Sequence, residues 1–409
     1  MAKRDIKCGL SVGSGQIICV LGTVNPENGI IEIISYGQDF CRGIKGGVVI
    51  DIDETSKSIT NAIEEAENKI KEEINEVYLG VRGTHIESCN SHGVMSISRT
   101  DKEITPEDVN SVIENTKAIQ ISNDREIIDI LVQEFSLDRQ RGVHNPVGME
   151  GNFLEAYALV ITASTTHLNN IFKSVEIAGF NVNELIYGLL AVGESVVTEE
   201  EKENGCLLID LGGQNIGLAI YSEKSLKYTK EINFGVDLIT RDISHALRTS
   251  LAQAKLIRDK YGIAVPSLLK ENEPIEYTGV DGRTIHTTDS KYLTEIIPPR
   301  VEEIFDKIGV ELQNTPYMND VIPGGIIITG SGSLLKGMRE ASEKIFGIET
   351  RVGFTQGVTG LNEIITNPTY AEAIGLLKYK PYMQISHNIK RISRKGVFSN
   401  IISKLRDWM

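Results

Sequence analysis

The segment CLLIDLGGQNIG at residues 206–217 decides the fold class of this chain. An apolar run, a glycine turn and a second apolar run in succession are the pattern of a β-hairpin. The segment CGLSVGSGQIICV at residues 8–20 has the same pattern, and a further β-type run follows each hairpin, at 30–36 and 225–232. The chain therefore begins two similar halves, near residues 6 and 205.

A third glycine turn, Gly330-Ser331-Gly332, follows a buried strand expected at 325–329 and precedes a helix expected at 333–346. Glycine turns let backbone N–H groups approach a phosphate, because no side chain intervenes. One such turn is weak evidence, but three predict a nucleotide in a cleft between two related lobes. The two hairpins would hold the phosphates, and the third turn would lie against the base and ribose.

These turns resemble those of the superfamily that includes actin, sugar kinases and heat-shock chaperones. Within it, the chain resembles the FtsA family of bacterial cell division proteins over nearly its whole length. The segments that carry this resemblance are GIKGGVVIDI (44–53), REIIDILVQEF (125–135), NPVGM (145–149), LLAVGESVVTEEEKENG (189–205), IPPRVEEI (297–304) and PGGIIITGSGSLLKG (323–337). The resemblance implies an α/β, actin-like fold with duplicated RNase H-like lobes, an inserted small α+β subdomain and a C-terminal amphipathic helix.

The resemblance and the pattern of runs and turns together divide the chain into six parts. The core of lobe I would comprise residues 1–83, 161–195 and 366–380, with a small inserted subdomain at 84–160. The core of lobe II would comprise residues 196–234 and 310–365, with a peripheral subdomain at 235–309. A basic linker at 381–395 and an amphipathic membrane helix at 396–409 would complete the chain.

Local signals place some of the elements within these parts. Thr105-Pro106-Glu107-Asp108 is a helix start, with Thr as the N-cap, Pro in the first turn and an acid at the third position. Pro298-Pro299 predicts the start of a second helix, which would run from 298 to 312. We expect the acidic run Glu199–Glu203 to be an exposed connector.

The resemblance implies ATP or ADP, with Mg²⁺, as the ligand of the cleft. The candidate nucleotide-binding residues are Gly13, Ser14, Gly15, Gln16, Asp210, Gly212, Gly213, Gln214, Asn215, Gly235, Lys255, Arg258, Gly330, Ser331, Gly332 and Ser333. Asp210 would hold the Mg²⁺ through water.

The sequence departs from the superfamily pattern where the phosphate chemistry would occur. The acid that usually precedes the first hairpin turn is Ser11, the last acid of the second hairpin pattern is Gly217, and a ribose-facing Glu is Lys255. Fewer carboxylates lower the repulsion of a triphosphate but weaken metal organisation and water activation. We therefore expect nucleotide binding with slow or absent hydrolysis, and we assign no catalytic residue.

The charge of the chain is unevenly distributed. The formal net charge is −14, but residues 373–409 contain eight basic residues and one acidic residue, so this tail is +7 and the other 372 residues are −21. An acidic chain argues against a protein that coats nucleic acid. A basic tail favours contact with an anionic surface.

Residues 396–409 have the pattern of an amphipathic helix. Fourteen residues would span about 21 Å, which is too short to cross about 30 Å of hydrocarbon. The apolar stripe consists of Val397, Phe398, Ile401, Ile402, Leu405, Trp408 and Met409, and the other face includes Lys404 and Arg406. Behind a basic linker, this pattern predicts a helix that lies in the interface of an anionic membrane. Docking of the helix on its own domain is the alternative.

The resemblance implies a protein that polymerises on the inner face of the cell membrane at the division septum. It would tether filaments of the tubulin-like protein FtsZ there, with Arg300 at the FtsZ contact, and help to recruit later division proteins. One membrane helix binds weakly, so polymerisation should strengthen attachment. Two alternatives stay open: a sugar or acetate kinase, which needs a catalytic acid in the cleft, and a PilM-like pilus or secretion assembly protein, which would not carry the terminal helix.

Overall fold

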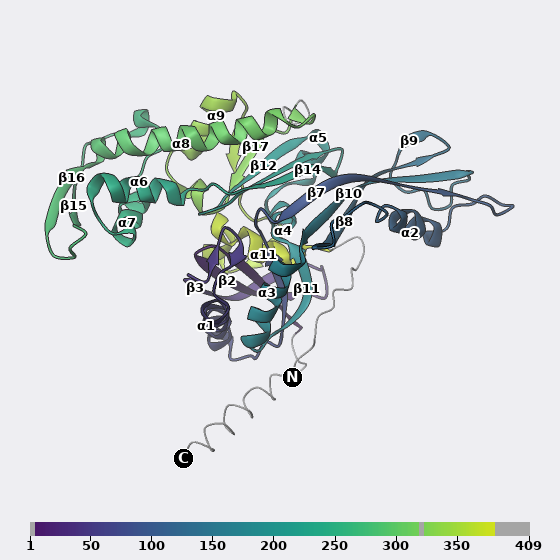
Figure 1. Cartoon of the computed structure of the whole chain (residues 1–409), viewed down its shortest axis with the longest axis horizontal. Helices are drawn as coiled ribbons and strands as arrows, with labels where there is room; N and C mark the ends of the chain where they lie inside the picture. The colour runs from purple at the N-terminus through teal and green to yellow at the C-terminus, as the bar shows by residue number, and fades with distance from the viewer. Residues whose placement is uncertain (1–4, 319–322, 381–409) are drawn as a thin grey trace, which may run out of the picture.

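Two sheets with the same strand order form the centre of the molecule, and a computed structural model describes residues 5–318 and 323–380 of the chain (Figure 1). The predicted linker and most of the basic tail, with the terminal helix, lie outside these residues. In the first sheet, β1 (Ile6–Gly13), β2 (Gln16–Val24) and β3 (Ile31–Asp39) form an antiparallel meander. On the other side of β1, β6 (Glu76–Val81) and β11 (Asn181–Tyr187) run parallel to it, and β19 (Val358–Gly360) pairs with β3.

The second sheet repeats this arrangement. Its order is β14-β13-β12-β17-β18, which matches β3-β2-β1-β6-β11 of the first sheet. The meander consists of β12 (Cys206–Leu211), β13 (Ile216–Ser222) and β14 (Ser225–Ile232), and the parallel strands are β17 (Ile326–Thr329) and β18 (Thr350–Val352). The duplication predicted from the two glycine hairpins is therefore confirmed.

Helices connect the parallel strands of the first sheet. The helix α1 (Ile52–Ile70) joins β3 to β6, and its apolar face, with Ile59, Ala62, Ile63 and Ala66, is buried. The Asp51 side chain caps its N-terminus by accepting from the Glu54 amide. The helix α3 (Thr165–Ile177) leads into β11. The apolar residues of α3, Leu168, Ile171 and Val175, are likewise buried on one face.

Two buried helices lie between the two main sheets. The helix α4 (Gly188–Val196) packs against β11, β12 and β13, and α11 (Ala371–Lys378) packs against α4 and β1. Contact between them is close, because a Cβ at Gly375 would lie 1.8 Å from the Ala191 carbonyl oxygen. These helices therefore join the two lobes through close-packed backbone.

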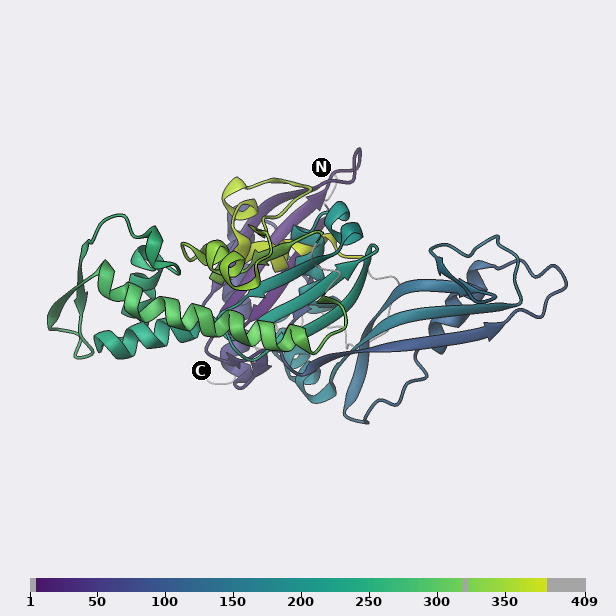
Figure 2. The ribbon, with the colours of Figure 1, turned by 90° about the horizontal axis from the view of Figure 1, so that it is seen from above.

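A separate sheet projects from one end of the molecule, as Figure 2 shows. Its order is β7-β10-β8-β9, and it has its own apolar core. The strands are β7 (Ile86–Ser96), β8 (Arg125–Leu137), β9 (Gln140–Val143) and β10 (Phe153–Ser164), and α2 (Pro106–Asn115) packs on the sheet. The Gln133 side chain donates to the Leu226 carbonyl oxygen at 2.8 Å, so the sheet also contacts β14 of the second lobe.

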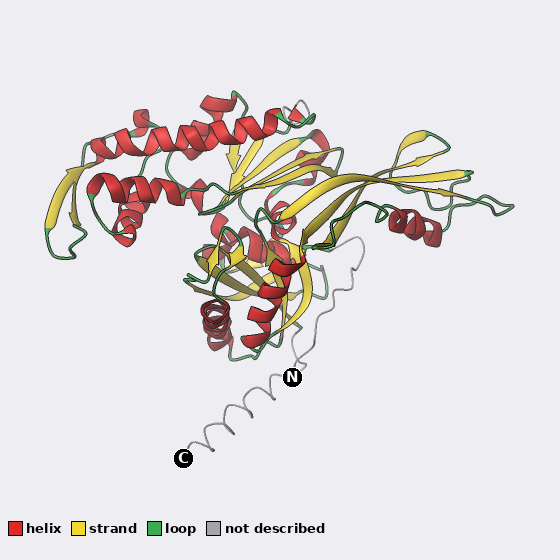
Figure 3. Cartoon of the chain, viewed as in Figure 1, coloured by secondary structure: helices red, strands yellow, loops and turns green. Residues whose placement is uncertain are grey.

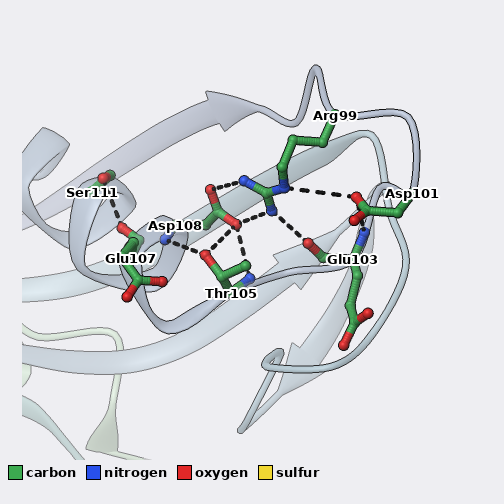
Figure 4. Close-up of polar contacts among 7 residues, drawn as sticks. All are labelled: Arg99, Asp101, Glu103, Thr105, Glu107, Asp108 and Ser111. Atoms are coloured by element: carbon green, nitrogen blue, oxygen red, sulfur yellow. Dashed lines mark hydrogen bonds and ion pairs between the residues drawn. The ribbon is translucent and has the colours of Figure 1, made fainter.

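The start of α2 is a capping box, as Thr105 and Asp108 predict. The Asp108 amide donates to the Thr105 hydroxyl, and the Thr105 amide donates to the Asp108 carboxylate. Figure 4 shows that the Arg99 guanidinium also contacts this carboxylate. The Arg99 hydrogen bond, with the contacts from Thr105, lowers the pKa of Asp108, even though its partial burial opposes the charge.

The other end of the molecule is mainly helical, with one hairpin at the tip (Figure 3). It consists of α6 (Asp237–Leu247), α7 (Leu251–Tyr261), β15 (Pro274–Thr278), β16 (Ile285–Asp289) and α8 (Ser290–Gln313). The predicted helix start at Pro298 is wrong, because α8 begins at Ser290 and contains both prolines. Its buried face runs through Leu293, Ile297 and Val301, and this packing maintains the helix across the prolines.

Two further elements differ from the sequence prediction. The helix predicted at 333–346 begins later, as α9 (Met338–Phe346), because Gly337 before it has a left-handed backbone with φ +87°. The run expected to be an exposed connector is a short helix, α5 (Glu199–Asn204). Within it, Lys202 is buried and pairs with Glu194, while Glu201 pairs with Arg351.

Short elements complete the described chain. They are β4 (Ile44–Lys45), β5 (Val48–Val49), α10 (Asn362–Ile365) and the 3₁₀ helices η1 (Pro266–Leu268), η3 (Ser331–Leu334) and η4 (Pro368–Tyr370). Among the helices of residues 5–318 and 323–380, none combines the length and the apolar character that crossing a membrane requires.

Candidate nucleotide-binding cleft

The three glycine turns open on one cleft of about 2020 Å³. The first turn joins β1 to β2, and Gly15 in it has φ +91°. The second turn joins β12 to β13, and the third follows β17. Because β12 and β17 are parallel, with Asp210 opposite Thr329, the second and third turns lie side by side. The topology thus brings together segments that are more than 300 residues apart in the sequence.

Most of the predicted nucleotide-binding residues line this cleft. They are Gly13, Ser14, Gly15, Gln16, Asp210, Gly212, Gly213, Gln214, Asn215, Lys255, Arg258, Gly330, Ser331 and Gly332. The lining has both acidic side chains, such as Asp237 and Glu271, and basic ones, such as Lys45, Lys255 and Lys336, and the basic ones can pair with an anionic ligand.

Gly235 and Ser333 are predicted site residues that the structure places behind the lining. A Cβ at Gly235 would lie 2.3 Å from the Gly213 carbonyl oxygen, so glycine here lets the start of α6 approach the second turn. The Ser333 hydroxyl is buried and donates to the Gly330 carbonyl oxygen at 2.8 Å. Both residues therefore support the turns and do not face the cleft.

Gly330 is required by the geometry of the third turn. Its φ is +77°, and a Cβ here would lie 2.2 Å from Asp210 Oδ1. Any side chain at this position would displace the Asp210 carboxylate and strain the backbone. The absence of a side chain keeps the backbone of the second and third turns in contact.

A fourth turn, which sequence reasoning missed, connects the first two. The turn between β4 and β5 contains Gly46 and Gly47, both with positive φ. The Gly47 amide donates to the Ser14 hydroxyl at 2.8 Å, and the Gly46 amide donates to Gln214 Oε1 at 3.0 Å. The sequence signal for this turn is its pair of adjacent glycines. They lie in residues 44–53, a segment that carries the family resemblance but for which no role in the site is predicted from the sequence.

Sequence reasoning also missed Arg82. It directly follows β6 in the first lobe, and its guanidinium contacts two carboxylates of the second lobe. Nη1 lies 2.5 Å from Asp210 Oδ2, and Nε lies 2.5 Å from Glu231 Oε1. Burial opposes the charge of Arg82, but these carboxylates outweigh it and raise the pKa of the guanidinium.

Glu372, near the start of α11, is the third carboxylate of this group. Its Oε2 lies 3.8 Å from Arg82 Nη1, and it lines the cleft together with Ser11. Burial raises the pKa of Glu372 to about 7, against the opposing effect of Arg82. A carboxyl group from α11 therefore lies near the position where the first hairpin lacks its usual acid.

The donors around Asp210 do not fit the predicted Mg²⁺ site. The Asp210 carboxylate is engaged by Arg82, and Ser11 replaces the second acid that the superfamily would offer. A guanidinium thus contacts the carboxylate to which the resemblance assigns the metal.

Two arginines predicted from the family resemblance are held by contacts within the chain. Arg258 of α7 lines the cleft and donates to the Thr240 hydroxyl at 2.8 Å. Arg300 of α8, the predicted FtsZ contact, lies away from the cleft. Its Nε and Nη2 donate to the two carboxylate oxygens of Asp242 at 2.6 and 3.0 Å.

Comparison with protein families gives matches over most of the chain. The model described as "Cell division protein FtsA" matches residues 207–375, and "SHS2 domain inserted in FTSA" matches residues 83–162. The cell division protein FtsA of Pseudomonas aeruginosa is 34% identical, covering 98% of this chain and 96% of its own length. The FtsA of Neisseria meningitidis serogroup B is 37% identical, covering 90% of this chain and 88% of its own length.

Comparison with solved structures shows the actin-like fold. A chain of the PilM-PilN type IV pilus biogenesis complex superimposes with a TM-score of 0.64 at 14% identity, covering 91% of this chain and 98% of that chain. MreB5 of Spiroplasma citri bound to AMPPNP gives a TM-score of 0.56 at 12% identity, covering 98% of both chains. The predicted fold class, with two related lobes and an inserted domain, is therefore confirmed.

Proposed function

Because the chain belongs to the FtsA family of cell division proteins, we propose that it binds ATP or ADP between its lobes and polymerises on the inner surface of the cell membrane. There it tethers FtsZ filaments at the division septum and helps to recruit later division proteins. The observation that carries the nucleotide part is the convergence of three glycine turns, from both lobes, on one cleft.

The nucleotide acts as a ligand that favours one arrangement of the lobes. Backbone amides of the first two turns are the donors available to its phosphates, and α7 presents Lys255 and Arg258 toward the same cleft. Hydrolysis is slow or absent, because Ser11 cannot act as the acid of the first hairpin. A purified chain that releases phosphate from ATP over many turnovers would contradict this expectation.

Membrane attachment is carried by the predicted amphipathic helix at 396–409, which lies outside the described residues. Support for it comes from the apolar stripe and from the tail charge of +7. FtsZ binding is assigned to the peripheral subdomain with Arg300, whose pairing with Asp242 fixes its position on α8. The family membership does not favour the kinase and the PilM-like alternatives.

Co-sedimentation with anionic liposomes tests the membrane and FtsZ parts together. The full chain should sediment with the liposomes and carry FtsZ with it, and deletion of residues 396–409 should abolish both effects. Ile401→Glu, on the apolar stripe, should also abolish binding. Asn400→Glu adds the same charge to the polar face and should largely retain it. Liposome binding that survives the deletion would reject the tail as the anchor.

A further inference from the structure

One buried cation lies among three carboxyl groups at the base of the cleft. The guanidinium of Arg82 contacts Asp210 and Glu231 of the second lobe and approaches Glu372 of α11 to 3.8 Å. Its side chain is 10% exposed, and that of Glu231 is fully buried. Tyr187 donates from its hydroxyl to Glu231 Oε1 at 3.1 Å, so Glu231 is held by Tyr187 as well as by Arg82.

Three glycines make the space for this group. A Cβ at Gly80 would lie 2.4 Å from Glu372 Oε1, and one at Gly217 would lie 2.3 Å from Arg82 Nη2. A Cβ at Gly188 would lie 2.7 Å from Arg82 Cδ. These glycines come from three different elements, β6, α4 and β13, so the space for Arg82 is part of the fold.

Arg82 lies close to the first and second glycine turns. In the parallel pairing of β1 and β6, Ser11 lies opposite Gly80, so Arg82 follows two residues later, beside the end of β1 that enters the first turn. Its partner Asp210 lies two residues before Gly212, where the second turn begins. The Arg82 guanidinium therefore lies at the base of both turns, where it offsets the Asp210 carboxylate.

We propose that Arg82 takes the charge-neutralising place of a divalent cation in this chain, so that nucleotide binding does not depend on Mg²⁺. This inference rests on the proposed nucleotide-binding function. By pairing with Asp210, the guanidinium removes a negative charge that would repel the phosphates. It also withdraws that carboxylate from the water shell of a metal. Charged hydrogen bonds of this kind are stronger than neutral ones, and the planar Arg fork can serve two carboxylates at once.

The test compares ATP affinity of the full chain in excess Mg²⁺ and in excess EDTA, by isothermal titration calorimetry. The dissociation constant of the native chain should be nearly the same in both. In Arg82→Gln, it should rise about tenfold or more in EDTA, because buried carboxylates then face the phosphates unpaired. Added Mg²⁺ should recover much of this loss, because the Asp210 carboxylate is free.

Arg351→Gln is the matched control, because it removes an arginine from a carboxylate pair with Glu201 outside the cleft. It should behave as the native chain in both conditions. Arg82→Lys retains the positive charge, so it should fold even if Arg82→Gln does not. In EDTA, it should bind ATP more tightly than Arg82→Gln.

Each outcome has a distinct meaning. No ATP binding by the native chain in either condition would reject the proposed nucleotide function. Binding by the native chain in Mg²⁺ but not in EDTA would overturn the role of Arg82 and leave that function standing. An Arg82→Gln variant that is folded and still indifferent to EDTA would also overturn it.

Discussion

Gly375→Ala should destabilise the junction between the lobes. Gly375 lies in α11, where it crosses α4, and an added Cβ would lie 1.8 Å from the Ala191 carbonyl oxygen. Ordinary contact begins near 3.4 Å, so the helices would have to separate by well over an ångström. Neither can do so freely, because α4 packs against β12 and β13, and α11 packs against β1 and β2.

The size of the effect follows from this geometry. Forcing an extra methyl group into a close-packed interior costs about 1–3 kcal/mol and occasionally more. The gain in helix propensity from Gly to Ala offsets up to about 1 kcal/mol of that cost. Because the clash is with backbone and not with a flexible side chain, we expect the upper part of the range and a net loss of about 2 kcal/mol.

Thermal unfolding followed by circular dichroism measures this loss, with Gly309→Ala as the matched control. Gly309 lies inside α8, and a Cβ there would meet Phe346 at 3.7 Å, which is ordinary contact. The control should therefore be neutral or stabilising by up to about 1 kcal/mol. If Gly375→Ala unfolds at the same temperature as Gly309→Ala or higher, the close packing of α4 on α11 is refuted.

Two further predictions concern the inserted sheet and its base. Asp129 is buried, which raises its pKa to about 6, so its contribution to stability is greatest below the unfolded pKa near 4 and is lost as the pH rises through 6. When the pH is raised from 4.5 to 7.5, the free energy of unfolding of Asp129→Asn, measured in urea, should therefore rise by about 2 kcal/mol relative to that of the native chain. A difference between the two proteins that does not change with pH would contradict this. Thr105→Ala removes the cap of α2 and should lower the stability of that helix, measured by hydrogen exchange, by about 1 kcal/mol. Ser111→Ala, a substitution at an exposed position of the same helix, should lower it by less than about 0.5 kcal/mol.

The elements that sequence predicts well are those whose signals are local. The hairpin 8–20 is specified by its own glycine turn and flanking apolar runs. The start of α2 is specified by Thr105 and Asp108, which are three residues apart and cap each other directly. A signal of this kind does not depend on the rest of the fold, so it can be recognised without the structure.

The errors occur where distant packing overrides a local signal. Pro298-Pro299 is a strong helix-start signal, yet α8 passes through it. The buried face of α8 extends from Leu293 to Leu312, and the apolar core holds the helix on both sides of the prolines. Conversely, the sequence after Gly332 does not show that Gly337 adopts a left-handed backbone, which moves the start of α9 to Met338.

The candidate site divides in the same way. The glycine turns can be found in the sequence, because each is a short motif with a recognisable neighbourhood. Arg82 cannot, because its partners Asp210 and Glu231 are 128 and 149 residues away. The space it needs is made by glycines on three elements. No local pattern marks an arginine that the topology brings to the base of a cleft.

The contacts between the lobes determine how much a nucleotide can do. In the described structure, Arg82 reaches Asp210 and Glu231, and the Gly46 amide reaches Gln214, so the first lobe holds the second turn directly. A ligand shifts the arrangement of the lobes only by its difference in affinity between the two states. With these contacts already present, part of the free energy that closes the cleft comes from the chain itself. A nucleotide bound as proposed would therefore adjust the closure of the lobes without being its sole cause.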